Sequence, residues 1–346
     1  WPNAVAGILW EQNNNKDIDK KFHIISSIKS TLKFSKSFSF IGQASIDYTN
    51  TDLITENQIV RLNPVRTGGK YNWNKVNDLV QNYQGLIKYE QKISDFDLFA
   101  FAGAAYQKRE DNNVYASTGD AGLLFPDWFS LDNADSRRWA SGGERGKVLG
   151  SRRGSDVLYS MLGSATLSYK NTYYLELQAR NDWNSTLKAP NNSYFYPGAS
   201  FSWNFSENID LPKLNFGKLR LSWADVGGGP STALTNRYFA NNVISVGQIP
   251  YPSGPIVVYP NSSIFLADII PFRKREFEAG FNTRWFTGNR LEVDLSYYTN
   301  NLYNQIVSQP ISPATGANSA SINTGNHKNW GIELFVKGSP LVTDNY

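Results

Sequence analysis

The sequence predicts an all-β fold in which long antiparallel strands form the wall of a membrane-spanning β-barrel. Three observations lead to this prediction. Apolar and polar side chains alternate with a period of two, the alternating segments are long, and short connections alternate with long ones. The segments run to about 12–14 residues, whereas a tilted strand needs about 9–11 to cross a bilayer and strands of soluble proteins average about 5–6.

Eleven strands are expected from this pattern. In the clearest of them, Leu175 and Leu177 lie on one face and Glu176 on the other, so one face is apolar and the other is charged. In the strand expected near 96–108, Phe99 and Phe101 interrupt the alternation, so the sequence leaves open which face of this strand is apolar. The expected strands lie near 22–34, 38–50, 79–93, 96–108, 156–169, 173–186, 194–205, 217–226, 273–286, 290–304 and 328–338.

The connections between these strands are of two kinds. Short links such as 35–37, 170–172 and 287–289 contain turn-forming residues. The long connections are expected near 51–78, 109–155, 227–272 and 305–327. Outer-membrane barrels have short periplasmic turns and longer extracellular loops, so we expect the long connections to be extracellular. Eleven is an odd count for a bacterial barrel, which favours reading residues 1–346 as one partial barrel domain.

The composition agrees with a barrel and excludes several other classes. Aromatic residues make up 14% of the chain, as 20 Phe, 19 Tyr and 10 Trp, and such residues form the interfacial girdles of outer-membrane barrels. The net charge of +4 comes from scattered residues, which argues against nucleic-acid binding. Cysteine is absent, so disulfides and thiolate metal sites are excluded. His23 and His327 lie far apart in the sequence, and no catalytic, metal or cofactor constellation is expected.

Three sets of strand motifs follow one another along the chain. They are YYLELQARNDWNSTL at 173–187 with NSYFYP at 192–197, KLRLSWADVG at 218–227, and PATG at 313–316 with NTGN at 323–326 and NWGIEL at 329–334. In this order and spacing they resemble SusC/RagA-type TonB-dependent outer-membrane transporters of Bacteroidetes. The resemblance implies part of a barrel of about 22 strands. The plug domain and TonB-contacting region of that family have no counterpart in this sequence.

The resemblance also implies a function. It predicts TonB-dependent import across the outer membrane of large nutrients, either oligosaccharides and other glycans or peptides. The implied partners are a SusD-like surface lipoprotein, TonB through the N-terminal region not found here, and outer-membrane lipid, with dimers of SusC–SusD pairs as a further expectation. No enzymatic activity is expected, and a barrel enzyme would need a nucleophile and base that the sequence does not offer.

Two sets of residues are candidates for contact with cargo. The first set shares the polar face of the strands and should line the lumen, because a charge facing lipid at the midplane costs about 2–4 kcal/mol. These residues either keep the lumen wall solvated and form ion pairs with a plug domain, or they contact the substrate. They are Glu176, Arg180, Asp182, Lys218, Arg220, Glu276, Glu278, Arg284, Glu292, Asp294, Glu333 and Lys337.

The second set lies in two of the long connections. Aromatic rings can stack on sugars or grip peptides while arginines donate hydrogen bonds, although the same rings could instead pack the loops or dock a lid. The candidates are Phe125, Trp128, Phe129, Arg137, Arg138, Trp139, Arg237, Tyr238, Phe239, Tyr251 and Tyr259. Asp111, Asp120 and Asp127 lack the dense spacing of a calcium loop, so a solvated loop is favoured.

A second hypothesis belongs to a different class. A soluble or surface-attached β-rich module, such as a glycan-binding adhesin, would also have alternating strands and aromatic loops. It would not explain the strand length, the sorting of short and long connections or the apolar outer faces. Dependence of the purified protein on detergent distinguishes the two hypotheses.

Overall fold

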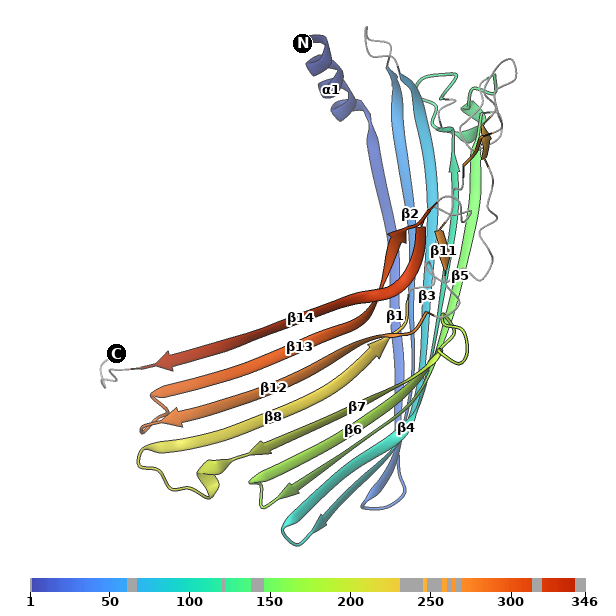
Figure 1. Cartoon of the computed structure of the whole chain (residues 1–346). Coiled ribbons are helices and arrows are strands. Elements are labelled where there is room, and N and C mark those ends of the chain that lie inside the picture. Colours follow the sequence, from blue (N-terminus) through green and yellow to red (C-terminus); the bar gives the residue numbers. More distant parts are fainter. Residues whose placement is uncertain are drawn as a thin grey trace. The chain divides into compact units, whose positions relative to one another are not determined.

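The fold is almost entirely β-structure (Figure 1). The computed structural model describes residues 2–60, 67–119, 122–137, 146–230, 245–247, 257–259, 263–265, 269–312 and 319–339. Eleven long strands confirm the predicted all-β membrane wall. They are β1 (Lys16–Lys33), β2 (Phe38–Val60), β3 (Thr67–Ile93), β4 (Phe96–Ser117), β5 (Val148–Tyr169), β6 (Tyr173–Asn184), β7 (Ser193–Trp203), β8 (Leu214–Gly228), β12 (Phe272–Trp285), β13 (Leu291–Pro310) and β14 (Ser319–Gly338).

The long strands pair antiparallel with their neighbours in chain order, in one sheet. β8 pairs directly with β12, so the chain between them is an excursion from the sheet. Within that excursion, β11 (Ser263–Phe265) adds to the sheet in parallel with β14. The other two short strands, β9 (Ser245–Gly247) and β10 (Val257–Tyr259), form a separate antiparallel pair.

The chain divides into two compact units. The first comprises 1–28, 44–82 and 107–155. The second comprises 29–43, 83–106 and 156–346. Strands β1–β5 therefore contribute residues to both units, whereas β6–β8 and β12–β14 belong wholly to the second.

Several strands run further than the alternation predicts. β2 continues to Val60 and β3 begins at Thr67, within the connection expected near 51–78. β4 and β5 likewise extend into 109–155, and β13 and β14 extend into 305–327. These additions are rich in Asn, Asp, Thr and Ser on both faces, so they show no apolar period although their backbones pair. The strand bounds are corrected accordingly, and the extracellular side of the long connections stays a prediction.

A helix precedes the first strand and was not predicted. α1 spans Pro2–Asn14, and its last turn is closed by side chains, since Asn13 and Asn14 donate to the carbonyls of Leu9 and Trp10 at 2.7 and 2.8 Å. Two 3₁₀ turns, η2 (Leu131–Asn133) and η3 (Phe205–Glu207), complete the helical elements described. None of the helices in the described residues is long and apolar enough to cross a membrane.

Ring contacts decide the facing of β4. The rings of Phe96 and Tyr169 lie 4.7 Å apart, and those of Tyr106 and Tyr159 lie 5.1 Å apart. The apolar alternation of β5 includes Tyr159 and Tyr169, so the even-numbered residues of β4 share that apolar face. Phe101 consequently lies on the opposite, polar face, which explains why the alternation alone left this strand open.

The apolar face is exposed rather than packed into a core. Leu177 is 53% exposed, and Ile332 and Leu334 are 65% and 64% exposed. The described buried hydrophobic cluster is small, with Leu187, Tyr194 and Ile269 at its centre. A soluble protein would bury most of this surface, so the pattern is that of a lipid-facing wall.

A continuous line of aromatic rings, the aromatic belt, crosses the apolar face at the end of the short links. Successive ring centroids lie 4.7, 6.4, 6.0, 5.9 and 5.5 Å apart. The belt consists of Phe96, Tyr169, Tyr173, Trp203, Phe205 and Phe281. Such rings are typical of the membrane–water interface of a barrel.

Candidate functional site

The strand register places all twelve predicted lumen residues on one face of the sheet, here called the charged face. Opposed residues on paired strands share a face, as do residues two apart along a strand. One row of opposed residues runs from Glu176 through Ser200 and Ser222 to Glu278. Neighbouring rows bring in the other ten: Arg180, Asp182, Lys218, Arg220, Glu276, Arg284, Glu292, Asp294, Glu333 and Lys337.

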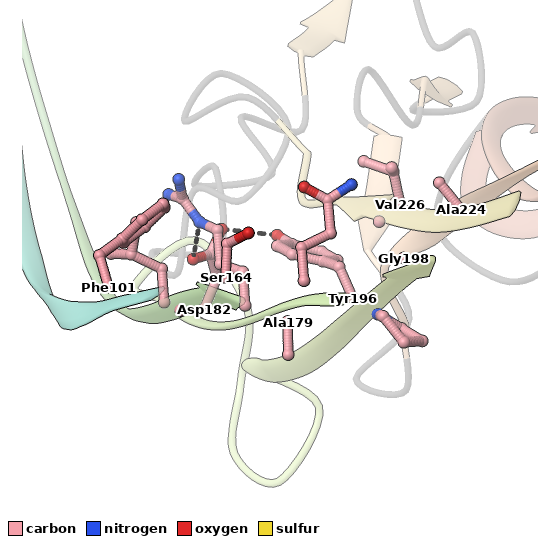
Figure 2. Close-up of a pocket in the computed structure, with 14 residues that line it drawn as sticks. Phe101, Ser164, Ala179, Asp182, Tyr196, Gly198, Ala224 and Val226 are labelled. Carbon is pink, nitrogen blue, oxygen red and sulfur yellow. Dashed lines mark hydrogen bonds and ion pairs between the residues drawn. The ribbon is translucent and has the colours of Figure 1, made fainter. Parts of the chain in front are cut away.

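A pocket of about 410 Å³ opens on the charged face over β4–β8 (Figure 2). It combines aromatic side chains, Phe101 and Tyr196, with the ionic pair of Arg180 and Asp182. Its lining is completed by Leu162, Gly163, Ser164, Gln178, Ala179, Pro197, Gly198, Ala224, Val226 and Gly227. A concave site with apolar walls and a few fixed polar groups is the usual form of a ligand pocket.

Asp182 organises the polar side of this pocket. One carboxylate oxygen accepts a hydrogen bond from Arg180 Nε at 2.6 Å, and the other accepts from the Tyr196 hydroxyl at 2.6 Å (Figure 2). Arg180 Nη2 also donates to Ser160 Oγ at 2.8 Å. The Asp182 side chain is only 6% exposed, whereas that of Arg180 is 41% exposed. The guanidinium is thus held in place while part of it faces the pocket.

A glycine keeps the centre of the pocket open. Gly198 lies directly opposite Gln178 in the β6–β7 register. A Cβ at this position would come within 2.7 Å of Gln178 Nε2 and 2.8 Å of its Cγ. Any larger residue would therefore push Gln178 aside and fill the space between the two strands.

A second ionic contact spans two strand spacings on the charged face. Arg220 on β8 donates to Asp294 on β13 at 3.0 and 3.3 Å, across the intervening β12. The residue of β12 opposite Arg220 is Gly280, and a Cβ there would lie 2.7 Å from Arg220 Nη2. Asn282 Nδ2 completes the group by donating to Asp294 at 2.8 Å. Gly280 thus makes room for the arginine to cross.

Gly280→Val should break the Arg220–Asp294 contact and lower the free energy of unfolding by about 1 kcal/mol. A charge-assisted hydrogen bond contributes about 1.5–3 kcal/mol, and partial exposure of both side chains reduces that value. Urea unfolding of the whole receptor in lipid vesicles measures the change. Gly338→Val is the matched control, since a Cβ at Gly338 meets nothing within 4 Å. Equal destabilisation by the two substitutions would contradict this role of Gly280.

A buried asparagine builds the loop that carries the best-described aromatic candidates. Asn133 is fully buried, and its Oδ1 accepts from the Phe125 amide at 3.0 Å. Its Nδ2 donates to the carbonyls of Phe125 and Trp128 at 2.7 and 2.6 Å. These hydrogen bonds hold the loop through its backbone, so its aromatic side chains are not needed for packing and point outward. Phe125 is 59% exposed and Trp128 is 51% exposed, and their ring centroids lie 6.3 Å apart. We call these two residues the aromatic pair.

The remaining loop candidates are placed less favourably or lie outside the described residues. Phe129 is half-buried. Arg137 is exposed and forms a two-point ion pair with Asp135 at 2.8 and 3.0 Å, which raises the pKa of its guanidinium. Arg138, Trp139, Arg237, Tyr238, Phe239, Tyr251 and the side chain of Tyr259 lie outside the described residues.

The aspartates considered for calcium do not come together in the described residues. Asp111 lies 3.8 Å from Arg152, Asp127 is hydrogen-bonded to Gln58, and Asp120 lies outside those residues. Within the described part of the chain, no group of three or more His, Asp or Glu side chains is arranged to hold a metal ion.

Sequence reasoning missed part of the pocket. Tyr196 was detectable, because the alternation of its strand puts Ala199 and Phe201 on the apolar face and Tyr196 on the opposite face, with the charged residues. Phe101 could not be assigned while the facing of β4 was open. Asn133 carried no signal, since a buried asparagine in a loop is recognised only by its hydrogen bonds.

Comparison with known proteins identifies the family. Residues 9–343 match the family described as TonB dependent receptor-like, beta-barrel. The chain belongs to this family. Two receptors of Formosa agariphila are similar in sequence to this TonB-dependent receptor chain. TonB-dependent receptor P26 is 23% identical over 364 residues, covering 100% of this chain and 34% of the relative. TonB-dependent receptor P3 is 22% identical over 277 residues, covering 79% and 26%.

Solved structures show the same fold. The RagAB peptide transporter superposes with a TM-score of 0.77 at 17% identity, covering 96% of this chain and 35% of that one. The siderophore receptor PiuA from Acinetobacter baumannii superposes with a TM-score of 0.56 at 16% identity, covering 95% and 46%. The family resemblance drawn from the strand motifs is therefore confirmed, and the likeness to RagAB agrees with its SusC/RagA type. This TonB-dependent receptor chain spans about a third of the length of the relatives in Formosa.

Proposed function

We propose that this chain is part of the barrel of an outer-membrane importer that takes up large nutrients, either glycans or peptides, with energy supplied through TonB. The observation that carries the proposal is the division of the sheet into two unlike faces. One face is apolar and exposed, and the other is a charged face with hydrogen-bonded ionic groups and a pocket. A wall of this kind separates lipid from an aqueous passage.

The remaining proposed features concern the whole receptor. Its partners would be a SusD-like surface lipoprotein, TonB acting on a plug domain, and the cargo, with pairs of receptor and lipoprotein assembling as dimers. RagAB, which has the same fold in this region, is a peptide transporter. The aromatic pair and the pocket beside Asp182 would contact the cargo, because rings and a fixed guanidinium suit both sugar faces and peptide groups.

A genetic uptake experiment tests the proposal. Deletion of the whole receptor should abolish accumulation of one class of labelled cargo, either an oligosaccharide mixture or a peptide mixture, and restoration should return it. Accumulation of both classes unchanged in the deletion strain, at concentrations where the parent strain depends on active uptake, would contradict import by this receptor. Dissipation of the proton gradient should have the same effect as the deletion.

The double substitution Phe125→Ala and Trp128→Ala should raise the half-saturation concentration for uptake of that cargo about tenfold. Each ring contact contributes about 0.5–1.5 kcal/mol, and 1.4 kcal/mol corresponds to a factor of ten. Initial uptake rates over a range of cargo concentrations measure the effect as a raised half-saturation concentration. Phe286→Ala is the matched control, since Phe286 is 41% exposed in the short link between β12 and β13. An equal rise of the half-saturation concentration in both variants would contradict contact between the aromatic pair and the cargo.

A further inference from the structure

Three cations lie on the apolar face immediately beyond its last apolar row. Along β12 the outward residues Phe281, Ala279 and Phe277 are followed by Arg275 and Arg273. Along β14 the outward residues Leu334, Ile332 and Trp330 are followed by Lys328. The register aligns these strands, so Trp223, Phe277 and Trp330 end the apolar band in one row, and Asp225, Arg275 and Lys328 form the next. We call Arg273, Arg275 and Lys328 the outer cationic cluster.

The two arginines of the cluster are held by a shared carboxylate. Asp225 Oδ1 accepts from Arg273 Nε at 2.9 Å, and its Oδ2 accepts from Arg275 Nη2 at 3.0 Å. Arg273 Nη2 also donates to the carbonyl of Phe195 at 2.9 Å, and the guanidinium of Arg275 lies 5.7 Å from the centre of the Tyr303 ring. The Asp225 side chain is only 6% exposed, whereas Arg275 remains 50% exposed. Asp225 therefore positions the arginines and leaves donors of Arg275 facing outward.

The cluster has a net positive charge. On the outward positions of β8, β12, β13 and β14, within the described residues, Asp225 is the single carboxylate. It stands against Arg273, Arg275 and Lys328, so three positive charges and one negative charge leave +2. On the charged face of the same strands, by contrast, the described residues include five acids and five lysines or arginines, so their charges balance. The excess of cations is confined to the lipid-facing side.

The position of the cluster fits a membrane–water interface. Two of the residues that end the apolar band, Trp223 and Trp330, are tryptophans, which favour this depth. A lysine or arginine costs about 2–4 kcal/mol at the midplane of a barrel wall but almost nothing near its edge, where anionic headgroups lie. Arg273 and Arg275 lie at the end of β12 that leads into the long connection 229–271, and Lys328 lies in the same row as Arg275, on the part of β14 that continues toward the connection 311–318. The asymmetry of the connections makes this the outer leaflet.

We propose that the outer cationic cluster binds the phosphate of a phosphorylated lipid headgroup in the outer leaflet. The planar guanidinium of Arg275 offers paired donors that match two phosphate oxygens, and Lys328 supplies a second, mobile charge two strands further on, across β13. The apolar band directly beneath receives the acyl chains of the same lipid. This assignment rests on the membrane position of the wall and does not require that the receptor transport any particular cargo.

Lipid-association measurements on the whole receptor test the assignment. The receptor is reconstituted into phosphatidylcholine vesicles that contain a spin-labelled phosphatidic acid, and the motionally restricted fraction of the label gives its relative association constant. Each cation near a membrane surface contributes about fivefold in affinity for anionic lipid. Lys328→Gln should lower the constant about fivefold, and the pair Arg275→Gln with Lys328→Gln should lower it by more than tenfold.

Matched controls keep the result interpretable. Lys274→Gln with Lys337→Gln removes two charges from the same strands on the charged face and should leave the constant unchanged. The exchange Arg275→Lys with Lys328→Arg preserves both charges and should retain most of the binding. Lys328 is exposed, so the single variant Lys328→Gln still gives a measurable association constant even if the double variant does not insert into the vesicles.

Two results would overturn the assignment. The first is an equal effect of the outward and charged-face variants, which would indicate a response to overall charge. The second is displacement of the labelled lipid by inorganic phosphate at a comparable concentration, which would indicate a site for free phosphate rather than a headgroup. Retention of the lipid in the presence of phosphate supports the headgroup. Because cargo uptake plays no part in these measurements, they stand or fall independently of the transport proposal.

Discussion

Leu177→Arg should destabilise the folded receptor by about 2–4 kcal/mol, the largest effect expected of any single substitution considered. Leu177 lies near the middle of β6 on the apolar face and is 53% exposed. An arginine there would face hydrocarbon at the depth where a barrel wall tolerates charge least. Equilibrium unfolding of the whole receptor by urea in vesicles, followed by tryptophan fluorescence, measures the change.

The neighbouring residue provides the matched control. Gln178 follows Leu177 directly, is also exposed, and faces the pocket on the charged face. Gln178→Arg should change the free energy of unfolding by less than about 1 kcal/mol, because its charge meets water. If the two substitutions destabilised the receptor equally, the assignment of the two faces would be wrong.

Asp182→Ala should lower the free energy of unfolding by about 2–3 kcal/mol. The substitution deprives Arg180 and Tyr196 of an acceptor held at 2.6 Å in each case, and it does so at a carboxylate that is almost completely buried. Loss of a hydrogen bond to a charged group costs about 1.5–3 kcal/mol, and the exposure of Arg180 limits the further cost. The vesicle unfolding assay measures this loss.

A double-mutant cycle shows whether the pocket residues act together. Tyr196→Phe alone removes one of the two hydrogen bonds and should cost about 1 kcal/mol. In the Asp182→Ala background the same substitution should cost almost nothing, because the bond is already lost, which gives a coupling energy of about 1 kcal/mol. Additive effects would mean that the contact between Tyr196 and Asp182 contributes nothing to stability.

The sequence predicted the strands well where lipid imposes a pattern. In β6 and β12 one face must be apolar, so the period of two marks both the strand and its facing. The pattern fails where neither face meets lipid, as in β2 beyond Asn50, although the backbone continues to pair there. Strand length was therefore underestimated at the ends that carry the long connections.

The alternation of side chains along a strand predicts only the face on which each site residue lies. It assigned Arg180 and Asp182 to the same face, and in the strand register they share that face. It could not reveal that Asp182 joins Arg180 to Tyr196, since that contact depends on which residues the register brings together. The crossing of Arg220 over Gly280 was hidden for the same reason.

The aromatic belt bears on how the wall responds to membranes of different thickness. Rings in mutual contact across several strands hold one margin of the apolar band at a set depth in the interface. The opposite margin ends in Trp223 and Trp330, which are separated by β12 and β13. A thicker or thinner bilayer would therefore keep its contact with the belt, and the mismatch would be taken up at the side of the long connections. Membrane composition would thus act first on the margin from which the loops arise.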